Sequence, residues 1–254
     1  MKRLGIEIEF TGCKREVVKE SLENIWGSKA RILTGSKTDN PYEYYKVKDK
    51  DSYEWTILRD RSVRAEVQGS SVDDNIYCCE LVSPILTASS LKTLFEVTDI
   101  IKALGGITNE TCGVHIHIDK PENFNDLLSL LRKWIIEQNE IYDFFSVADW
   151  RREKYCKLYK NFPLLTTFRD EDALMSFLFG KYLDKDEEKR NLRYFGLNLY
   201  SIYTHNTVEF RIFNGTLDKV EIAKIIDWVL HFCYNINDIS DYMPELGKVL
   251  YSIM

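Results

Sequence analysis

The segment GIEIEF, residues 5–10, decides how the fold begins. Residues 4–10 alternate strictly, with apolar side chains at positions 6, 8 and 10 and with Glu7 and Glu9 between them. A period of two predicts a β-strand whose two faces differ. Glu7 and Glu9 then share one face about 7 Å apart, and two like charges so close cost free energy unless a cation compensates them. The strand is therefore a candidate metal site, and a solvated strand face is the alternative.

The segment CGVHIHID, residues 112–119, repeats this alternation with histidines. His115, His117 and Asp119 share one face of the predicted strand, and apolar residues form the other face. Two imidazoles on one strand face can bind a metal or an anion. The alternative is a half-exposed strand whose histidines have no special role.

The segment TVEFRIFNGTLD, residues 207–218, predicts a third polar strand face with Glu209 beside Arg211. These two residues form either a plain ion pair or a metal ligand beside a phosphate clamp, because arginine matches phosphate oxygens bidentately. Taken alone, the segment favours the ion pair. Two further carboxylates, Glu80 in CCELVSP and Asp60 in LRDRSV, lie near the ends of apolar strands and are weaker candidates.

The joint pattern carries more information than any single segment. It predicts one polar site that binds a divalent metal and a phosphate-bearing ligand, formed by Glu7, Glu9, Glu80, His115, His117, Glu209 and Arg211. Carboxylates with histidine suit Mg²⁺ or Mn²⁺, and the arginine suits a phosphate. The sequence contains neither a G-x-x-x-x-G-K-[ST] loop nor a G-x-G-x-x-G turn. Any nucleotide is therefore not held by a P-loop or by a Rossmann turn.

The remaining pattern predicts an α+β fold with a largely antiparallel sheet, because strands recur with helices between them in no regular βαβ rhythm. Further strands are expected within 42–68, including Glu54–Leu58 and Ala65–Gln68, and at Ile76–Val82. Helices are expected at about 14–26, 89–104 and 124–142, and after a capping box formed by Asp218 and Glu221. Residues 194–203 fit either a strand or a helix.

Composition limits the class of protein. The 254 residues are 44% hydrophobic and 29% charged, with a net charge of −6, which predicts a globular chain able to bury a core. We expect a single domain over residues 1–254, a cytoplasmic location, and six free cysteines in a reducing compartment. No basic face, signal peptide or membrane span is evident, so nucleic acid and membranes are not expected partners.

Five segments in order resemble the amidoligases, members of the carboxylate–amine ligase superfamily found in phages and bacteria. They are GIEIEF at 5–10, CELVSPIL at 79–86, TCGVHIHI at 111–118, LRYFGLN at 192–198 and TVEFRIFNGTLD at 207–218. The resemblance implies a fold like the glutamine synthetase catalytic domain, with a curved sheet and helices on its convex face. It also implies an ATP-dependent ligase that joins a carboxylate to an amine through an acyl phosphate, with two or more Mg²⁺ or Mn²⁺ ions.

The resemblance also implies roles for single residues. Glu7 and Glu9 divide between two metal sites, Glu80 joins one of them, and Glu209 with His115 or His117 joins the other. Arg211 and Arg193 clamp the transferred phosphoryl group, while Asn198 and Asp60 face the substrate. The larger relatives carry a further glutamate where this chain reads SPILTAS, so either one metal site is a ligand short or Asp60 or Glu66 replaces the missing carboxylate. Arg61 stands where a small residue is usual.

Two other functions fit the same residues. One is a metal-dependent hydrolase or phosphatase, in which the carboxylates and histidines activate water. The other is a non-catalytic protein that binds a nucleotide or a peptide. For the ligase, the expected partners are small-molecule or peptide carboxylates and amines. Residues 143–190 are expected to form short helices and loops that insert into the domain and partly act as a lid.

Overall fold

A computed structural model describes residues 3–35, 42–160, 162, 167–180, 193–234 and 243–254. The chain divides into two compact units. The first unit contains Arg3–Ile116 and Asn214–Met254, and the second contains His117–Phe213. Both mix helices with mainly antiparallel strands, which confirms the predicted α+β class. A single domain and a curved sheet like that of glutamine synthetase stay predictions.

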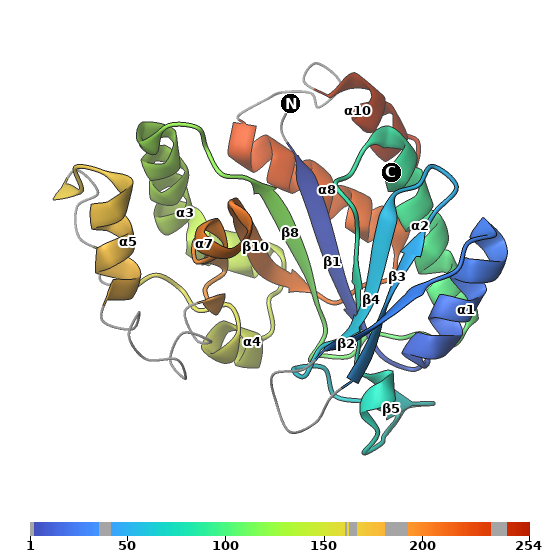
Figure 1. Ribbon diagram of the computed structural model, residues 1–254. Helices are drawn as coiled ribbons and strands as arrows, with labels where there is room; N and C mark the ends of the chain where they lie inside the picture. The colour runs from blue at the N-terminus through green and yellow to red at the C-terminus, as the bar shows by residue number, and fades with distance from the viewer. Residues whose placement is uncertain (1–2, 36–41, 161, 163–166, 181–192, 235–242) are drawn as a thin grey trace. The chain divides into compact units, whose positions relative to one another are not determined.

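The first unit is built on a sheet in which the strands follow the order β2-β3-β4-β7-β1-β8 (Figure 1). Each pair from β2 to β1 in this order is antiparallel. The strands are β1 (Leu4–Phe10), β2 (Arg31–Gly35), β3 (Tyr42–Lys48), β4 (Glu54–Arg59), β7 (Cys79–Val82) and β8 (Gly113–Asp119). A separate hairpin consists of β5 (Glu66–Val67) and β6 (Ser70–Ser71). The predicted strands at 4–10, 54–58 and 114–119 are therefore confirmed.

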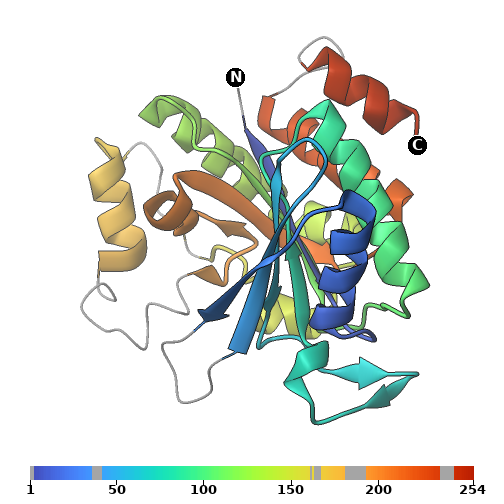
Figure 2. The same ribbon diagram turned by 45° about the vertical axis from the view of Figure 1, so that its right-hand side comes forward.

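Among the described residues of the first unit there are four α-helices, and Figure 2 shows α1 and α2 side by side against its strands. They are α1 (Arg15–Trp26), α2 (Ala88–Ala103), α8 (Lys219–Tyr234) and α10 (Pro244–Tyr251). Helix α1 ends at Gly27, which adopts the left-handed conformation with φ 66°. The apolar sides of β1 are fully buried at Ile6, Ile8 and Phe10, so the core fixes which way Glu7 and Glu9 point.

One prediction about an element end is wrong, and another is confirmed only in part. Strand β7 begins at Cys79 and not at Ile76, because Asn75–Tyr77 form a 3₁₀ turn whose preceding residue, Asp74, accepts a hydrogen bond from the backbone of Ile76. At α8, Asp218 does accept hydrogen bonds from the first turn. The carboxylate of Glu221, however, accepts a hydrogen bond from the Thr216 hydroxyl, and no reciprocal bond of a capping box is seen among the described contacts.

The second unit joins the end of β8 to a short sheet and a set of helices. Its elements are α3 (Phe124–Phe144), α4 (Asp149–Lys154), α5 (Glu171–Phe179), β9 (Leu197–Asn198), α7 (Ser201–His205) and β10 (Thr207–Asn214). Helix α3 packs on β10 through Trp134 and Phe210, whose ring centroids lie 5.6 Å apart. Residues 194–203 thus contain both a strand and a helix. The short helices expected within 143–190 are confirmed where that segment is described, and its role as a lid stays a prediction.

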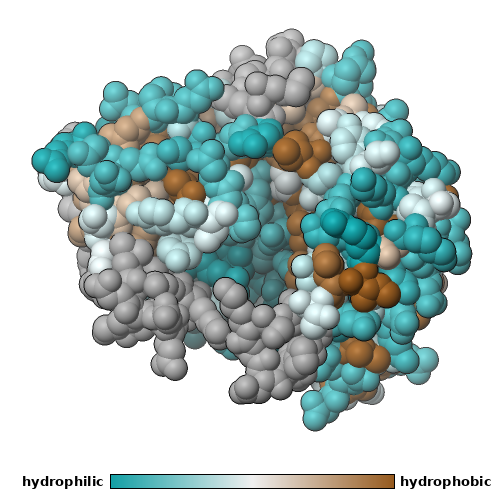
Figure 3. Space-filling model, viewed as in Figure 1, coloured by the Kyte–Doolittle hydropathy of each residue, from teal (hydrophilic) through white to brown (hydrophobic). Residues whose placement is uncertain are grey.

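The surface in Figure 3 is mainly hydrophilic, with apolar side chains in small separate groups. All six cysteines are free thiols, as predicted. Among the described residues, none of the helices combines the length and the apolar character that crossing a bilayer requires.

Candidate functional site

The first unit places two carboxylates opposite each other on neighbouring strands. Glu9 of β1 pairs in register with Glu80 of β7, and they are only 2% and 7% exposed. One ligand atom each from Glu9, Glu80 and His115 lie within 4.8 Å of one another. Carboxylate oxygens with one imidazole nitrogen form a donor set that Mg²⁺ or Mn²⁺ accepts. This trio, which we call the acidic cluster, therefore fits a divalent cation.

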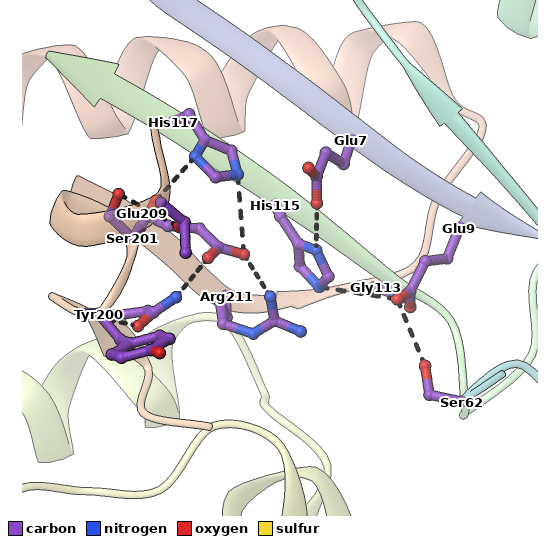
Figure 4. Close-up of polar contacts among 12 residues, drawn as sticks. Glu7, Glu9, Ser62, Gly113, His115, His117, Tyr200, Ser201, Glu209 and Arg211 are labelled. Carbon is purple, nitrogen blue, oxygen red and sulfur yellow. Dashed lines mark hydrogen bonds and ion pairs between the residues drawn. The ribbon is translucent and has the colours of Figure 1, made fainter. Parts of the chain in front are cut away.

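Neighbouring groups orient two members of the acidic cluster, Glu9 and His115 (Figure 4). The backbone N–H of Gly113 donates to Oε2 of Glu9 at 2.6 Å, and the oxygen of the Ser62 hydroxyl lies 3.5 Å from Oε1 of Glu9. Nδ1 of His115 hydrogen-bonds with Oε2 of Glu7 at 3.1 Å, while Nε2 lies 3.9 Å from Oε1 of Glu9. In the tautomer in which Nδ1–H donates to the Glu7 carboxylate, the lone pair of Nε2 faces Glu9, as a metal ligand requires.

The electrostatics of Glu80 reflect its burial among other carboxylates. Burial raises the pKa of Glu80 well above its ordinary value, and the charges of Glu7, Asp60 and Glu9 raise it further. A buried carboxylate with carboxylate neighbours is unfavourable unless a proton or a metal ion neutralises it. The sequence therefore places in the core a set of charges that a bound cation would stabilise.

Asp60 and Glu66 were the two candidates for the missing carboxylate near Glu80, and the structure separates them. Asp60 directly follows β4, acts electrostatically on Glu80, and accepts a hydrogen bond from the Ser62 hydroxyl at 2.5 Å. Ser62 thus links Asp60 to Glu9. The Glu66 carboxylate instead accepts a hydrogen bond from Asn109 at 3.1 Å and lies 3.7 Å from Arg64. Of the two, Asp60 is the carboxylate beside the acidic cluster.

The second unit contains another buried polar group, which we call the arginine cluster: Asn198, Glu209 and Arg211. Their exposed fractions are 2%, 4% and 8%. Arg211 donates to Oε1 of Glu209, and Nδ2 of Asn198 donates to Oε2 at 2.5 Å (Figure 4). Of the two alternatives for this segment, the ion pair between Glu209 and Arg211 is present, and it is buried. That Glu209 also binds a metal and Arg211 a phosphate stays a prediction.

His117 lies beside Glu209 within the second unit. Its Nδ1 hydrogen-bonds with the Thr207 hydroxyl at 2.9 Å and with the Ser201 hydroxyl at 3.3 Å, and these two hydroxyls lie 2.7 Å apart. Its Nε2 lies 3.8 Å from Oε1 of Glu209. Sequence reasoning did not select Ser201, Thr207 or Ser62. The alternation of Thr207 with Glu209 and Arg211 on one strand face was the available signal for Thr207.

Arg193 differs from the other predicted residues because its side chain is exposed. Its guanidinium lies over the ring of Tyr194, 5.3 Å from the centroid. The structure thus groups Glu7, Glu9, Glu80, Asp60 and His115 in the first unit. It groups His117, Asn198, Glu209 and Arg211 in the second. That all seven residues of the joint pattern serve one site stays a prediction.

Comparison with known proteins identifies the family. The model of the family described as "Putative amidoligase enzyme" matches residues 1–233. No curated protein and no solved structure matches the chain. The match spans both units and includes every residue of the acidic cluster and of the arginine cluster. The chain belongs to the amidoligase family.

Proposed function

We propose that the protein is an ATP- and Mg²⁺-dependent ligase that joins a carboxylate to an amine through an acyl phosphate. The observation that carries this proposal is the acidic cluster, where Glu9, Glu80 and His115 bring ligand atoms within 4.8 Å in a buried setting. Such a cluster of like charges is unfavourable unless it serves to bind a cation. Membership of the amidoligase family supports a ligase reaction.

In this proposal, the residues of the first unit hold metal. Glu9, Glu80 and His115 are the ligands, Glu7 orients His115 and contributes charge, and Asp60 completes the set beside Glu80. Glu209 with His117 provides ligands for a further ion. A bound Mg²⁺ would neutralise phosphate oxygens and so favour phosphoryl transfer. Mn²⁺ would satisfy the same oxygen and nitrogen donors.

The arginine cluster serves the phosphate. Glu209 holds the Arg211 guanidinium in one orientation, and Asn198 in turn holds Glu209. A guanidinium fixed in this way can stabilise charge on a transferred phosphoryl group without reorganising. We assign the exposed Arg193 as the second cation of the clamp, and Asn198 as a contact for the nucleotide or the substrate.

The proposed reaction has two steps. An oxygen of the acid substrate attacks the γ-phosphorus of ATP, and the bond from that phosphorus to the β–γ bridging oxygen breaks, which releases ADP and leaves an acyl phosphate. The amine then attacks the acyl carbon, loses a proton, and displaces inorganic phosphate to give the amide. The chain's residues contribute by holding the reactants together and by balancing charge.

The test is ATP-dependent release of ADP and phosphate with pools of amino acids, short peptides and polyamines as acids and amines. The proposed roles predict that Glu9→Ala and Arg211→Ala each lower turnover by about 10²- to 10³-fold, the loss typical of a group that stabilises transition-state charge. The matched controls are Glu245→Ala and Arg31→Ala, which remove exposed side chains of the same types. Both controls should turn over like the parent.

Two outcomes would contradict the proposal. Equal turnover by Glu9→Ala, Arg211→Ala and the parent would remove the assigned roles. Hydrolysis of amides or phosphate esters without any nucleotide, abolished by chelation of the metal, would show a metal-dependent hydrolase instead.

A further inference from the structure

Strand β10 extends beyond β9, the short strand that pairs with it in the second unit. Strand β9 pairs only Asn198 with Glu209 and Leu197 with Phe210. One residue further on, the N–H of Arg211 still donates to the carbonyl of Gly196 at 2.8 Å. In an antiparallel pair the N–H and C=O of one residue face the same neighbour. The carbonyl of Arg211 therefore faces the same edge, and so does that of Phe213, two residues along.

The side chain of Arg151, on α4, meets these two carbonyls. Its NH2 group donates to the carbonyl oxygen of Arg211 at 3.1 Å and to that of Phe213 at 3.3 Å. The side chain is only 2% exposed. Buried backbone carbonyls require donors, and a planar guanidinium can serve two of them in a fixed geometry. Arg151 thus takes the place of strand β9 where that strand has ended.

The backbone that carries Arg151 is itself anchored. The carbonyl of Arg151 accepts hydrogen bonds from the N–H groups of Tyr155 and Cys156, at 2.9 and 2.8 Å. The carbonyl of Cys156 accepts one from the Tyr142 hydroxyl at 2.6 Å. That hydroxyl also packs against Gly196, whose carbonyl binds Arg211. The guanidinium of Arg151 and the carbonyl of Gly196 therefore both bind the backbone of β10 along the edge that faces β9.

We infer that Arg151 is a positioning residue for Arg211 and Glu209, and this inference rests on the proposed function. The buried guanidinium of Arg151 holds the backbone of β10 at Arg211. It thereby fixes the direction in which the side chains of Arg211 and Glu209 project from one face of the strand. Helix α4 thereby acts on the arginine cluster, although none of the segments that resemble the family lies within 143–190. Arg151 acts through the backbone of β10, to which its side chain donates.

The experiment compares Arg151→Met with Arg152→Met in the full-length protein. Arg152 is a matched control because it lies on the same helix and also donates to carbonyls, those of Val147 and Tyr142, neither of which belongs to β10. In Arg151→Met we expect amide hydrogen exchange in a peptide covering 207–214 to accelerate at least tenfold. We expect kcat for ATP turnover to fall by about 10- to 100-fold, with KM for ATP within threefold of the parent. Arg152→Met should leave both readouts unchanged.

Arg151→Lys is the second variant, because it keeps the charge but lacks the planar guanidinium. It also keeps the test decisive if the methionine variant misfolds. It should give intermediate exchange and an intermediate kcat. Unchanged exchange at 207–214 in both Arg151 variants would overturn the inference. So would a loss of kcat equal in Arg151→Met and Arg152→Met. If the parent shows no ATP turnover, the proposed function fails while the exchange comparison still decides whether Arg151 holds β10.

Discussion

Gly196 offers a sharp test of how the second unit is packed. A Cβ at this position would lie 1.9 Å from the Tyr142 hydroxyl oxygen and 2.7 Å from Cγ2 of Ile212. Real Cβ atoms do not approach other heavy atoms so closely, so Gly196→Ala must displace either the backbone of residue 196 or the buried Tyr142 ring. The carbonyl of Gly196 binds the N–H of Arg211 at 2.8 Å, and this bond would stretch.

The expected cost follows from these two effects. Overpacking a dense core costs about 1–3 kcal/mol, and loss of one buried hydrogen bond adds about 0.5–1.5 kcal/mol. We therefore expect Gly196→Ala to lower the free energy of unfolding by about 2–4 kcal/mol. Tyr142→Phe alone removes the bond to the Cys156 carbonyl, at a cost of about 1–3 kcal/mol. The double variant should be less destabilised than the sum, because the phenylalanine ring lacks the clashing oxygen.

The assay is urea unfolding followed by circular dichroism for the parent, both single variants and the double variant. The control is Gly180→Ala, where the new Cβ would lie 3.8 Å from Cβ of Ser176, its nearest neighbour among the described residues, and where the backbone is helical. We expect that variant to be neutral or slightly stabilised. Full stability of Gly196→Ala, or strict additivity in the double variant, would refute the packing argument.

Three further predictions concern titratable groups. Glu80→Gln should stabilise the metal-free protein at pH 7 by about 0.5–2 kcal/mol, because burial and neighbouring carboxylates oppose an ionised Glu80. The same substitution should abolish most of the stabilisation that Mn²⁺ gives the parent, which is about 2.7 kcal/mol when the Mn²⁺ concentration is 100 times Kd. Melting curves in which Mn²⁺ raises Tm equally in both proteins would contradict this. Burial raises the pKa of Tyr142 and of Tyr159 above the ordinary value, so their stabilising contribution is complete below about pH 10 and is lost as the pH rises further. A titration at 295 nm should show both ionising only with unfolding, and ionisation in the folded protein would count against it. Burial raises the pKa of Cys13 to about 12, so at pH 8 iodoacetamide should alkylate this thiol only in urea, as mass spectrometry can check, and rapid labelling of the folded chain would oppose it.

Local sequence patterns determined most of the elements. Strict alternation in residues 4–10 and 207–213 predicted β1 and β10, because side chains on a strand point to opposite faces whatever surrounds them. Gly27 predicted the end of α1 because a left-handed residue stops a helix at little cost. The start of β7 was wrong by three residues, since apolar residues alone do not distinguish a strand from the 3₁₀ turn that Asp74 caps.

The candidate residues were likewise visible in the sequence, but their relations were not. Alternation placed Glu9 and Glu80 on strand faces, whereas strand pairing set them opposite each other and made burial act on Glu80. The tertiary structure also placed Asp60, and not Glu66, beside Glu80. The donation from Arg151 to the carbonyl of Arg211 joins residues 60 positions apart. A sequence read locally shows which face a side chain takes, while contacts between distant segments depend on register and packing, which only the tertiary structure decides.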